Sequence, residues 1–138
     1  MNEVENAIQE IEIYGFTILK HVLTEEQALE MRETLILLDR KVGEESNHGG
    51  TARLVYNLPV LDQVFHKTID HQRTIPILEH FLDDTLILGS LNARIVRPGD
   101  GYQGLHGDIP QAMINMDSPV MMNTVWMLDD FSPANGAT

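Results

Sequence analysis

The segment LNARIVRPGDGYQGLHGDIP, residues 91–110, decides the fold and the chemistry expected of this 138-residue chain. Its first six residues predict a strand, and the Pro-Gly dipeptide at 98–99 predicts a turn after it. His106 and Asp108 follow, two residues apart. Side chains at this spacing on an extended segment lie on the same side, because side chains alternate along a strand. An imidazole and a carboxylate are therefore expected to face one point.

The His106–Asp108 pair has a metal interpretation and a plainer one. Two histidines and one carboxylate hold Fe(II) in non-haem oxygenases, so the pair supplies two of the three ligands. The other histidines of the chain provide no obvious second histidine ligand. The plainer interpretation is a loop histidine beside a turn aspartate, because this spacing also arises by chance.

Outward from this segment, helical patterns come first along the chain and strand patterns follow. Apolar spacing predicts a helix around 4–11 that ends at Gly15, and a capping box formed by Thr24 and Gln27 predicts a helix over 25–41. Further helices are predicted over 59–69 and 73–82, a flexible loop over 43–52, and strands over 16–22, 85–89, 91–96 and 120–128. This order predicts an α+β or mainly β fold in a single domain, helical over about 1–84 and with barrel strands over about 85–138.

Composition excludes several classes of function. The chain carries 9 Lys and Arg against 21 Asp and Glu, a net charge of −12, so we expect neither nucleic acid nor an anionic membrane as a partner. It has no cysteine, which excludes disulfides, zinc–thiolate sites, iron–sulfur clusters and cysteine nucleophiles. The chain shows no signal peptide and no apolar run that could span a bilayer. These features predict a soluble, cytoplasmic chain.

Three separated parts of the sequence carry a family resemblance. They are YGFTIL with LTEEQ (14–19 and 23–27), NARIVRPG with QGLHGD (92–99 and 103–108), and VWMLDDFSPANGA (125–137). Together, and in this order, they resemble the phytanoyl-CoA dioxygenase family of Fe(II)/2-oxoglutarate oxygenases. The resemblance covers nearly the whole chain. It implies a double-stranded β-helix, a jelly-roll-like, cupin-like barrel with iron at one mouth.

The resemblance also implies a chemistry and a set of site residues. His106 and Asp108 correspond to two of the iron ligands, with 2-oxoglutarate as co-substrate and O2 as the oxidant that hydroxylates a small organic substrate. Trp126 corresponds to a residue that lines the co-substrate pocket. Candidates for polar contacts to 2-oxoglutarate, on chemistry and approximate position, are Asn92, Arg94 and Arg53.

The chain departs from the family pattern at its end. It stops at Thr138, before the stretch in which the family places its distal histidine and the arginine that pairs the 2-oxoglutarate carboxylate. We therefore expect a C-terminally truncated member with an incomplete barrel, weak or absent turnover, and exposed sheet edges through which a homodimer forms. The alternatives are a non-catalytic, small-molecule-binding β-barrel domain with His106 and Asp108 as polar pocket residues, and an interaction domain with an incidental motif.

Overall fold

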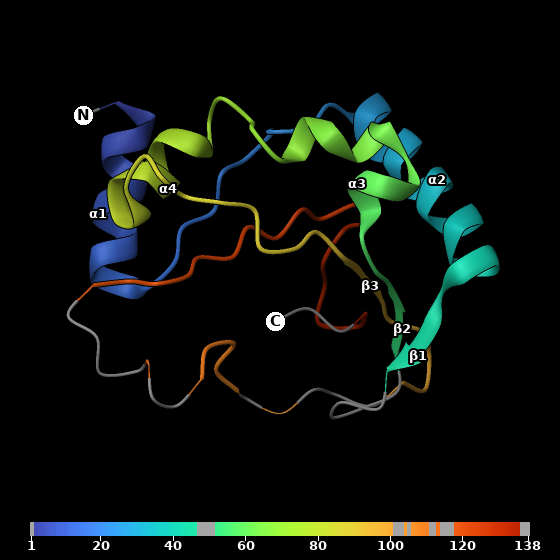
Figure 1. Ribbon diagram of the computed structural model, residues 1–138. Coiled ribbons are helices and arrows are strands. Elements are labelled where there is room, and N and C mark those ends of the chain that lie inside the picture. Colours follow the sequence, from blue (N-terminus) through green and yellow to red (C-terminus); the bar gives the residue numbers. More distant parts are fainter. Residues whose placement is uncertain are drawn as a thin grey trace.

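A computed structural model describes residues 2–46, 52–100, 104, 106–110, 113 and 118–135. Within these ranges helices and short strands occupy the first two thirds of the chain (Figure 1). In chain order the elements are α1 (Glu3–Tyr14), α2 (Glu25–Val42), β1 (Glu44–Ser46), β2 (Ala52–Val55), α3 (Leu58–Leu61), the 3-10 helix η1 (Gln63–Thr68), α4 (Ile75–Leu82) and β3 (Ala93–Ile95).

Local signals set the ends of the two longest helices. The first helix ends at Gly15, whose φ of 82° is left-handed and whose N–H donates to the Ile11 carbonyl at 2.8 Å. At the start of α2 the Gln27 N–H donates to Thr24 Oγ1 at 3.2 Å, and Gln27 Oε1 accepts from the Thr24 N–H at 2.9 Å. These two of the four predicted helices are confirmed, and the second runs one residue further than expected.

The three strands form one antiparallel sheet in the order β1-β2-β3. Ser46 pairs with Ala52 in the first ladder, and Arg53 pairs with Ile95 in the second. Helix α2 contacts β2 and η1, so the sheet, α2 and α3 lie at one end of the molecule, while α1 and α4 contact each other at the opposite end (Figure 1). The strand β1 lies inside the 43–52 segment that the sequence predicted as a loop.

The expected double-stranded β-helix is wrong. The described residues form an α+β arrangement whose small sheet does not close into a barrel. The segments 16–22, 85–89 and 120–128, predicted as strands, cross the molecule as long traces but form no ladder among the described residues (Figure 1). A β-strand is defined by its backbone hydrogen bonds to a neighbouring strand. Residues with high β propensity therefore form no strand where no neighbouring segment lies in register with them.

The core lies where α2 crosses the sheet. Its buried apolar side chains come from α2, β2, α3 and η1: Met31, Leu35, Val55, Leu58, Val64 and Phe65. Val55 and Phe65 are 0% and 1% exposed. Removing such a side chain from water contributes about 1.5–3 kcal/mol, so this cluster is the main source of stability at this end of the fold.

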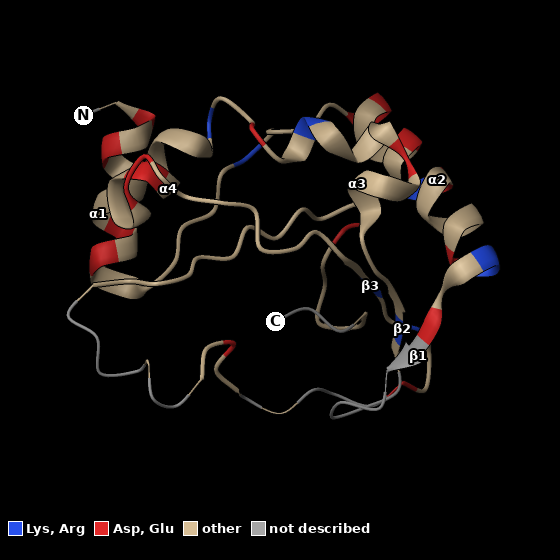
Figure 2. Cartoon of the chain, viewed as in Figure 1, with Lys and Arg blue, Asp and Glu red and all other residues tan. Residues whose placement is uncertain are grey.

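Acidic residues recur along α1 and α2 (Figure 2). Both first turns are acidic, with Glu3 and Glu5 in α1 and Glu25 and Glu26 in α2, which suits the positive end of the helix dipole. Among the described residues, no helix is long and apolar enough to cross a membrane.

Arg73 joins three parts of the N-terminal half. Its Nε and Nη2 lie 2.8 and 2.5 Å from the two carboxylate oxygens of Glu3 on α1. Its guanidinium also donates to the carbonyls of Lys20 and His21, at 2.9 and 3.0 Å. His21 has a left-handed φ of 54°, so these bonds hold a backbone conformation that few non-glycine residues adopt. The planar fork of arginine suits this set of acceptors.

We expect Glu3→Gln to lower the melting temperature at neutral pH and to have little effect in acid. The hydrogen bond from Arg73 lowers the pKa of Glu3 from its ordinary 4.5, although desolvation opposes this. The stabilisation is therefore complete above pH 4.5 and disappears as the pH falls through the lowered pKa. Thermal unfolding of both proteins across this range measures it, with Glu12→Gln on the same helix as control. An equal loss at every pH would contradict the assignment.

Candidate functional site

His106 and Asp108 lie together, as their spacing predicts. Nε2 of His106 is 3.2 Å from Oδ1 of Asp108, and the two side chains are 50% and 48% exposed. On the other side of the imidazole ring, Nδ1 lies 2.9 Å from the carbonyl oxygen of Gly104. The His106 ring is thus hydrogen bonded to the backbone at Nδ1, and the pair is half-exposed to solvent.

The protons of this pair follow from the donor and acceptor inventory. A carbonyl oxygen only accepts, so the hydrogen bond to Gly104 places a proton on Nδ1 of His106. In the neutral ring Nε2 then presents a lone pair, and the carboxylate of Asp108 is also an acceptor. Two acceptors 3.2 Å apart repel unless a cation lies against both. That cation is either a proton on Nε2, which makes an imidazolium–carboxylate ion pair, or a metal ion.

The separation also suits a metal ion bound by both residues. Two ligand atoms in adjacent positions of an octahedron, each about 2.1 Å from the metal, are about 3.0 Å apart. The observed 3.2 Å is close to this value. Imidazole nitrogen with carboxylate oxygen is the donor set that Fe(II) and similar ions accept. No group of three or more His, Cys, Asp or Glu side chains at metal-binding separation occurs in the part of the chain that the structure describes.

Asn123 is a member of this site that the sequence analysis did not single out. Its Nδ2 donates to Oδ2 of Asp108 at 2.5 Å. The signal that could have found it is a polar residue inside the apolar run VMMNTVWML at 120–128. Three residues later Trp126 donates from Nε1 to Thr124 Oγ1 at 3.2 Å, and its ring meets His71 edge-on at 5.5 Å.

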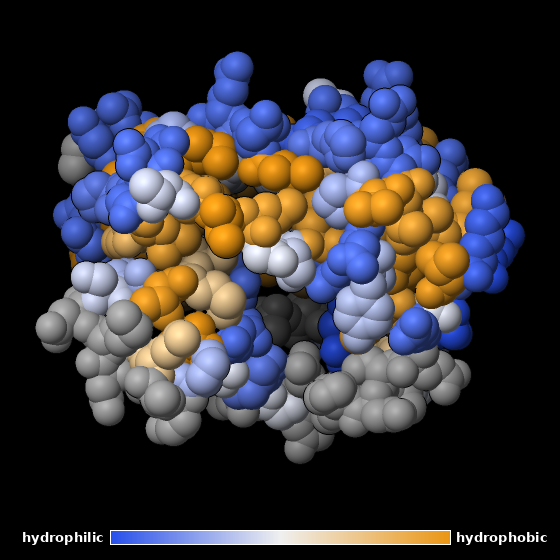
Figure 3. All heavy atoms as spheres, in the orientation of Figure 1, coloured by the Kyte–Doolittle hydropathy of each residue, from blue (hydrophilic) through white to orange (hydrophobic). Residues whose placement is uncertain are grey.

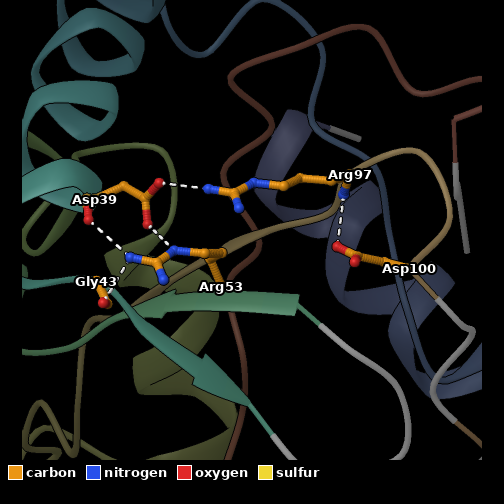
Figure 4. Close-up of polar contacts among 5 residues, drawn as sticks. All are labelled: Asp39, Gly43, Arg53, Arg97 and Asp100. Carbon is orange, nitrogen blue, oxygen red and sulfur yellow. Dashed lines mark hydrogen bonds and ion pairs between the residues drawn. The ribbon is translucent and has the colours of Figure 1, made fainter.

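Arg53, a candidate for binding 2-oxoglutarate, is engaged inside the protein (Figure 4). Its Nε donates to Oδ1 of Asp39 at 2.6 Å, and its Nη2 donates to the carbonyls of Asp39 and Gly43 at 2.9 and 2.6 Å. Asp39 is 7% exposed, and its other carboxylate oxygen accepts from Arg97 Nη2 at 2.9 Å. We call Asp39, Gly43, Arg53 and Arg97 the Asp39 cluster. It gives Arg53 a structural role.

The remaining predicted co-substrate residues lie on or beside β3. Arg94 is an exposed residue of that strand, opposite Leu54 in the ladder. Asn92 accepts a hydrogen bond from the Asn57 N–H at 3.0 Å, which stabilises the left-handed Asn57 before α3. The hydrogen bonds of Arg53, Asn92 and Trp126 go to other parts of the chain: Arg53 bonds Asp39 and Gly43, Asn92 bonds Asn57, and Trp126 bonds Thr124. Their contact with 2-oxoglutarate stays a prediction.

The turn before the pair is formed by the Pro-Gly dipeptide. The Asp100 N–H donates to the Arg97 carbonyl at 3.0 Å, and the Arg97 N–H donates to Asp100 Oδ2 at 2.8 Å. Gly99 has a φ of 90°, the left-handed conformation that glycine adopts at the third position of such a turn. The Asp39 cluster and this turn together fix the backbone where the described chain leaves β3.

The pair is the best candidate site among the described residues. In comparisons with known proteins the chain matches no family model, no curated protein and no solved structure. The geometry of the pair and the residues that carry the sequence resemblance are therefore the observations that bear on its chemistry.

We expect Gly43→Ala to destabilise the fold by roughly 1–3 kcal/mol, because it overpacks the Asp39 cluster. A Cβ at Gly43 would lie 2.1 Å from Asp39 Oδ1 and 2.7 Å from Arg53 Nη2. The matched control is Gly89→Ala, where the new Cβ meets no atom within 4 Å, and less than about 1 kcal/mol is expected. Urea unfolding measures both variants. Equal effects would show that the packing around Gly43 does not matter.

Proposed function

We propose that the chain binds Fe(II) through His106 and Asp108, and that it is an Fe(II)/2-oxoglutarate-dependent oxygenase related to the phytanoyl-CoA dioxygenases, with a small organic molecule as substrate. The three sequence blocks that resemble this family support the reaction class. The net charge of −12 supports a small molecule rather than a nucleic acid as the partner. The absence of cysteine suits the cytoplasm, where disulfides are rare.

One observation carries the metal part of the proposal. Nε2 of His106 and Oδ1 of Asp108 face each other at 3.2 Å, while the hydrogen bond to Gly104 places the imidazole proton on the opposite nitrogen. A hydrogen bond from the second ring nitrogen to a carbonyl is the usual support of a metal-binding histidine, since it fixes the tautomer and the ring orientation.

Each residue of the pair has a separate task. His106 presents a neutral nitrogen lone pair, and Asp108 brings a negative charge that offsets one charge of a divalent ion. When bound, Fe(II) with 2-oxoglutarate and O2 supplies the oxidising chemistry of hydroxylation. Half-exposed side chains leave room for water, for co-substrate or for a ligand from outside the described residues.

A second candidate function is a non-catalytic domain that binds a small molecule. The observation that favours it is the lack of a third ligand beside the pair within the described ranges. In that case His106 and Asp108 form an imidazolium–carboxylate ion pair whose two N–H groups are used within the protein, so the remaining carboxylate lone pairs of Asp108 accept hydrogen bonds from a polar ligand. The two candidates differ in whether a metal ion replaces the proton.

We expect the chain to bind Mn(II), used as the probe for Fe(II), and His106→Ala to abolish the binding. Loss of the nitrogen ligand leaves one carboxylate oxygen, which holds a divalent ion weakly. Electron paramagnetic resonance of the remaining free Mn(II) measures this directly. The control is His80→Ala, an exposed position on α4 whose ring contacts Phe81.

Succinate release from 2-oxoglutarate in Fe(II)-loaded samples tests the oxygenase step in the same proteins. We expect slow release that depends on His106, because the described part of the chain supplies two ligands at this site. Binding of Mn(II) without any succinate would retain the metal site and reject the oxygenase. Equal Mn(II) binding by the chain and by His106→Ala would reject the site itself and favour the second candidate.

We further propose that two copies pair through the outer edge of β3 and the irregular segment 85–91 that leads to it. In the sheet β3 pairs only with β2, so its outer edge carries no partner strand among the described residues. Large apolar side chains stay exposed, including Ile87 at 87% and Val125 at 74%. Figure 3 shows apolar side chains gathered across the middle of one face, below a hydrophilic rim. Unpaired edges and apolar surface both favour association.

Light scattering is expected to give twice the 15.6 kDa mass of one chain, with the dimer fraction rising with salt. Salt matters because two chains of charge −12 repel each other and ions screen the repulsion. Ile87→Lys should shift the protein to monomer. Val60→Lys, at a position 86% exposed on α3, is the matched control. A monomer mass at every salt concentration would reject the dimer.

A further inference from the structure

Asn123 contacts the carboxylate of the proposed metal site from a segment distant in sequence. Its Nδ2 lies 2.5 Å from Oδ2 of Asp108, fifteen residues earlier in the chain. A carboxylate only accepts hydrogen bonds, so the Asn123 amide nitrogen is the atom that faces it. A hydrogen bond to an ionised acceptor is shorter and stronger than one between neutral groups.

The two oxygens of Asp108 therefore have different partners. Oδ2 accepts from Asn123, whereas Oδ1 faces Nε2 of His106 at 3.2 Å. Without Asn123 the carboxylate, which is 48% exposed, could rotate about its side-chain bonds and exchange its two oxygens. With Asn123 in place, Oδ1 is the oxygen presented to a cation and Oδ2 is occupied by an N–H donor.

Asn123 is itself held by the contacts of its segment. Trp126 meets the ring of His71 edge-on at 5.5 Å, which attaches the segment to the residues before α4. The Trp126 Nε1–H also donates to Thr124 Oγ1 at 3.2 Å. These contacts lie within three residues of Asn123 and attach its segment to His71.

We propose that Asn123 is a positioning residue of the metal site, which orients Asp108 so that Oδ1 and His106 Nε2 converge on one cation. This inference rests on the proposed metal-binding function. A hydrogen bond between exposed groups contributes little to the stability of the fold, so orientation of the carboxylate is the effect that its loss should reveal. Outer partners of metal ligands typically change metal affinity by about 10-fold to 100-fold.

The test compares Mn(II) affinity and thermal unfolding in the unmodified chain and in Asn123→Ala, Asn123→Gln and Asn6→Ala. We expect Asn123→Ala to weaken Mn(II) binding by at least about tenfold without changing the melting temperature. Asn123→Gln, which keeps the amide on a longer side chain, should restore part of the affinity. Asn6 is an exposed asparagine of α1, and its replacement should leave the affinity unchanged.

A second measurement needs no metal. In the metal-free protein the side-chain amide protons of Asn123 should shift in the NMR spectrum when Asp108→Asn removes the ionised acceptor. Unchanged Mn(II) affinity in Asn123→Ala, while the unmodified chain binds, would overturn the positioning role and leave the proposed function intact. No Mn(II) binding by the unmodified chain would overturn both. No amide shift would show that the hydrogen bond is not formed in solution, which also overturns the positioning role.

Discussion

The buried carboxylate of Asp39 is the constraint on which the arrangement of this chain depends. An ionised group with 7% of its surface exposed must be paired, since an unpaired buried charge costs about 3–5 kcal/mol. Arg53 on β2 and Arg97 after β3 both donate to it, at 2.6 and 2.9 Å. The pairing fixes the end of α2 over the sheet and fixes the exit of β3, from which the chain continues to His106.

Some segments of strand-like composition form the sheet and others stay irregular, because only some have a neighbouring strand to pair with. β2 has a neighbouring strand on each side, so its backbone groups are hydrogen bonded. Helix α2 contacts it, so its apolar side chains are buried. The segments 85–89 and 120–128 have strand-like composition but no ladder among the described residues, and Ile87 and Val125 remain exposed. Residue composition thus indicates which segments suit a sheet, but a segment becomes a strand only beside a neighbour in register.

What the sequence could predict was local. The capping box of Thr24 and the left-handed Gly15 act within four residues, and His106 lies only two residues from Asp108. What it could not predict was contact at long range. Arg97 reaches Asp39 across 58 positions, and Asn123 reaches Asp108 across 15. Such pairs leave no periodic signal in one sequence, and the predicted barrel failed because its ladders are contacts of the same kind.

Hydrogen bonds to the protein restrict the geometry of the His106–Asp108 pair. Its two outer atoms, Nδ1 of His106 and Oδ2 of Asp108, are each hydrogen bonded to the protein, at 2.9 and 2.5 Å. The inner atoms face each other at 3.2 Å, so in the proposed metal site a metal ion would displace a proton from the Nε2 lone pair. Two ligands give less binding energy than three, and the balance then depends on how firmly their geometry is held before binding. In the proposed metal site, the partners of the outer atoms are therefore expected to change the metal affinity.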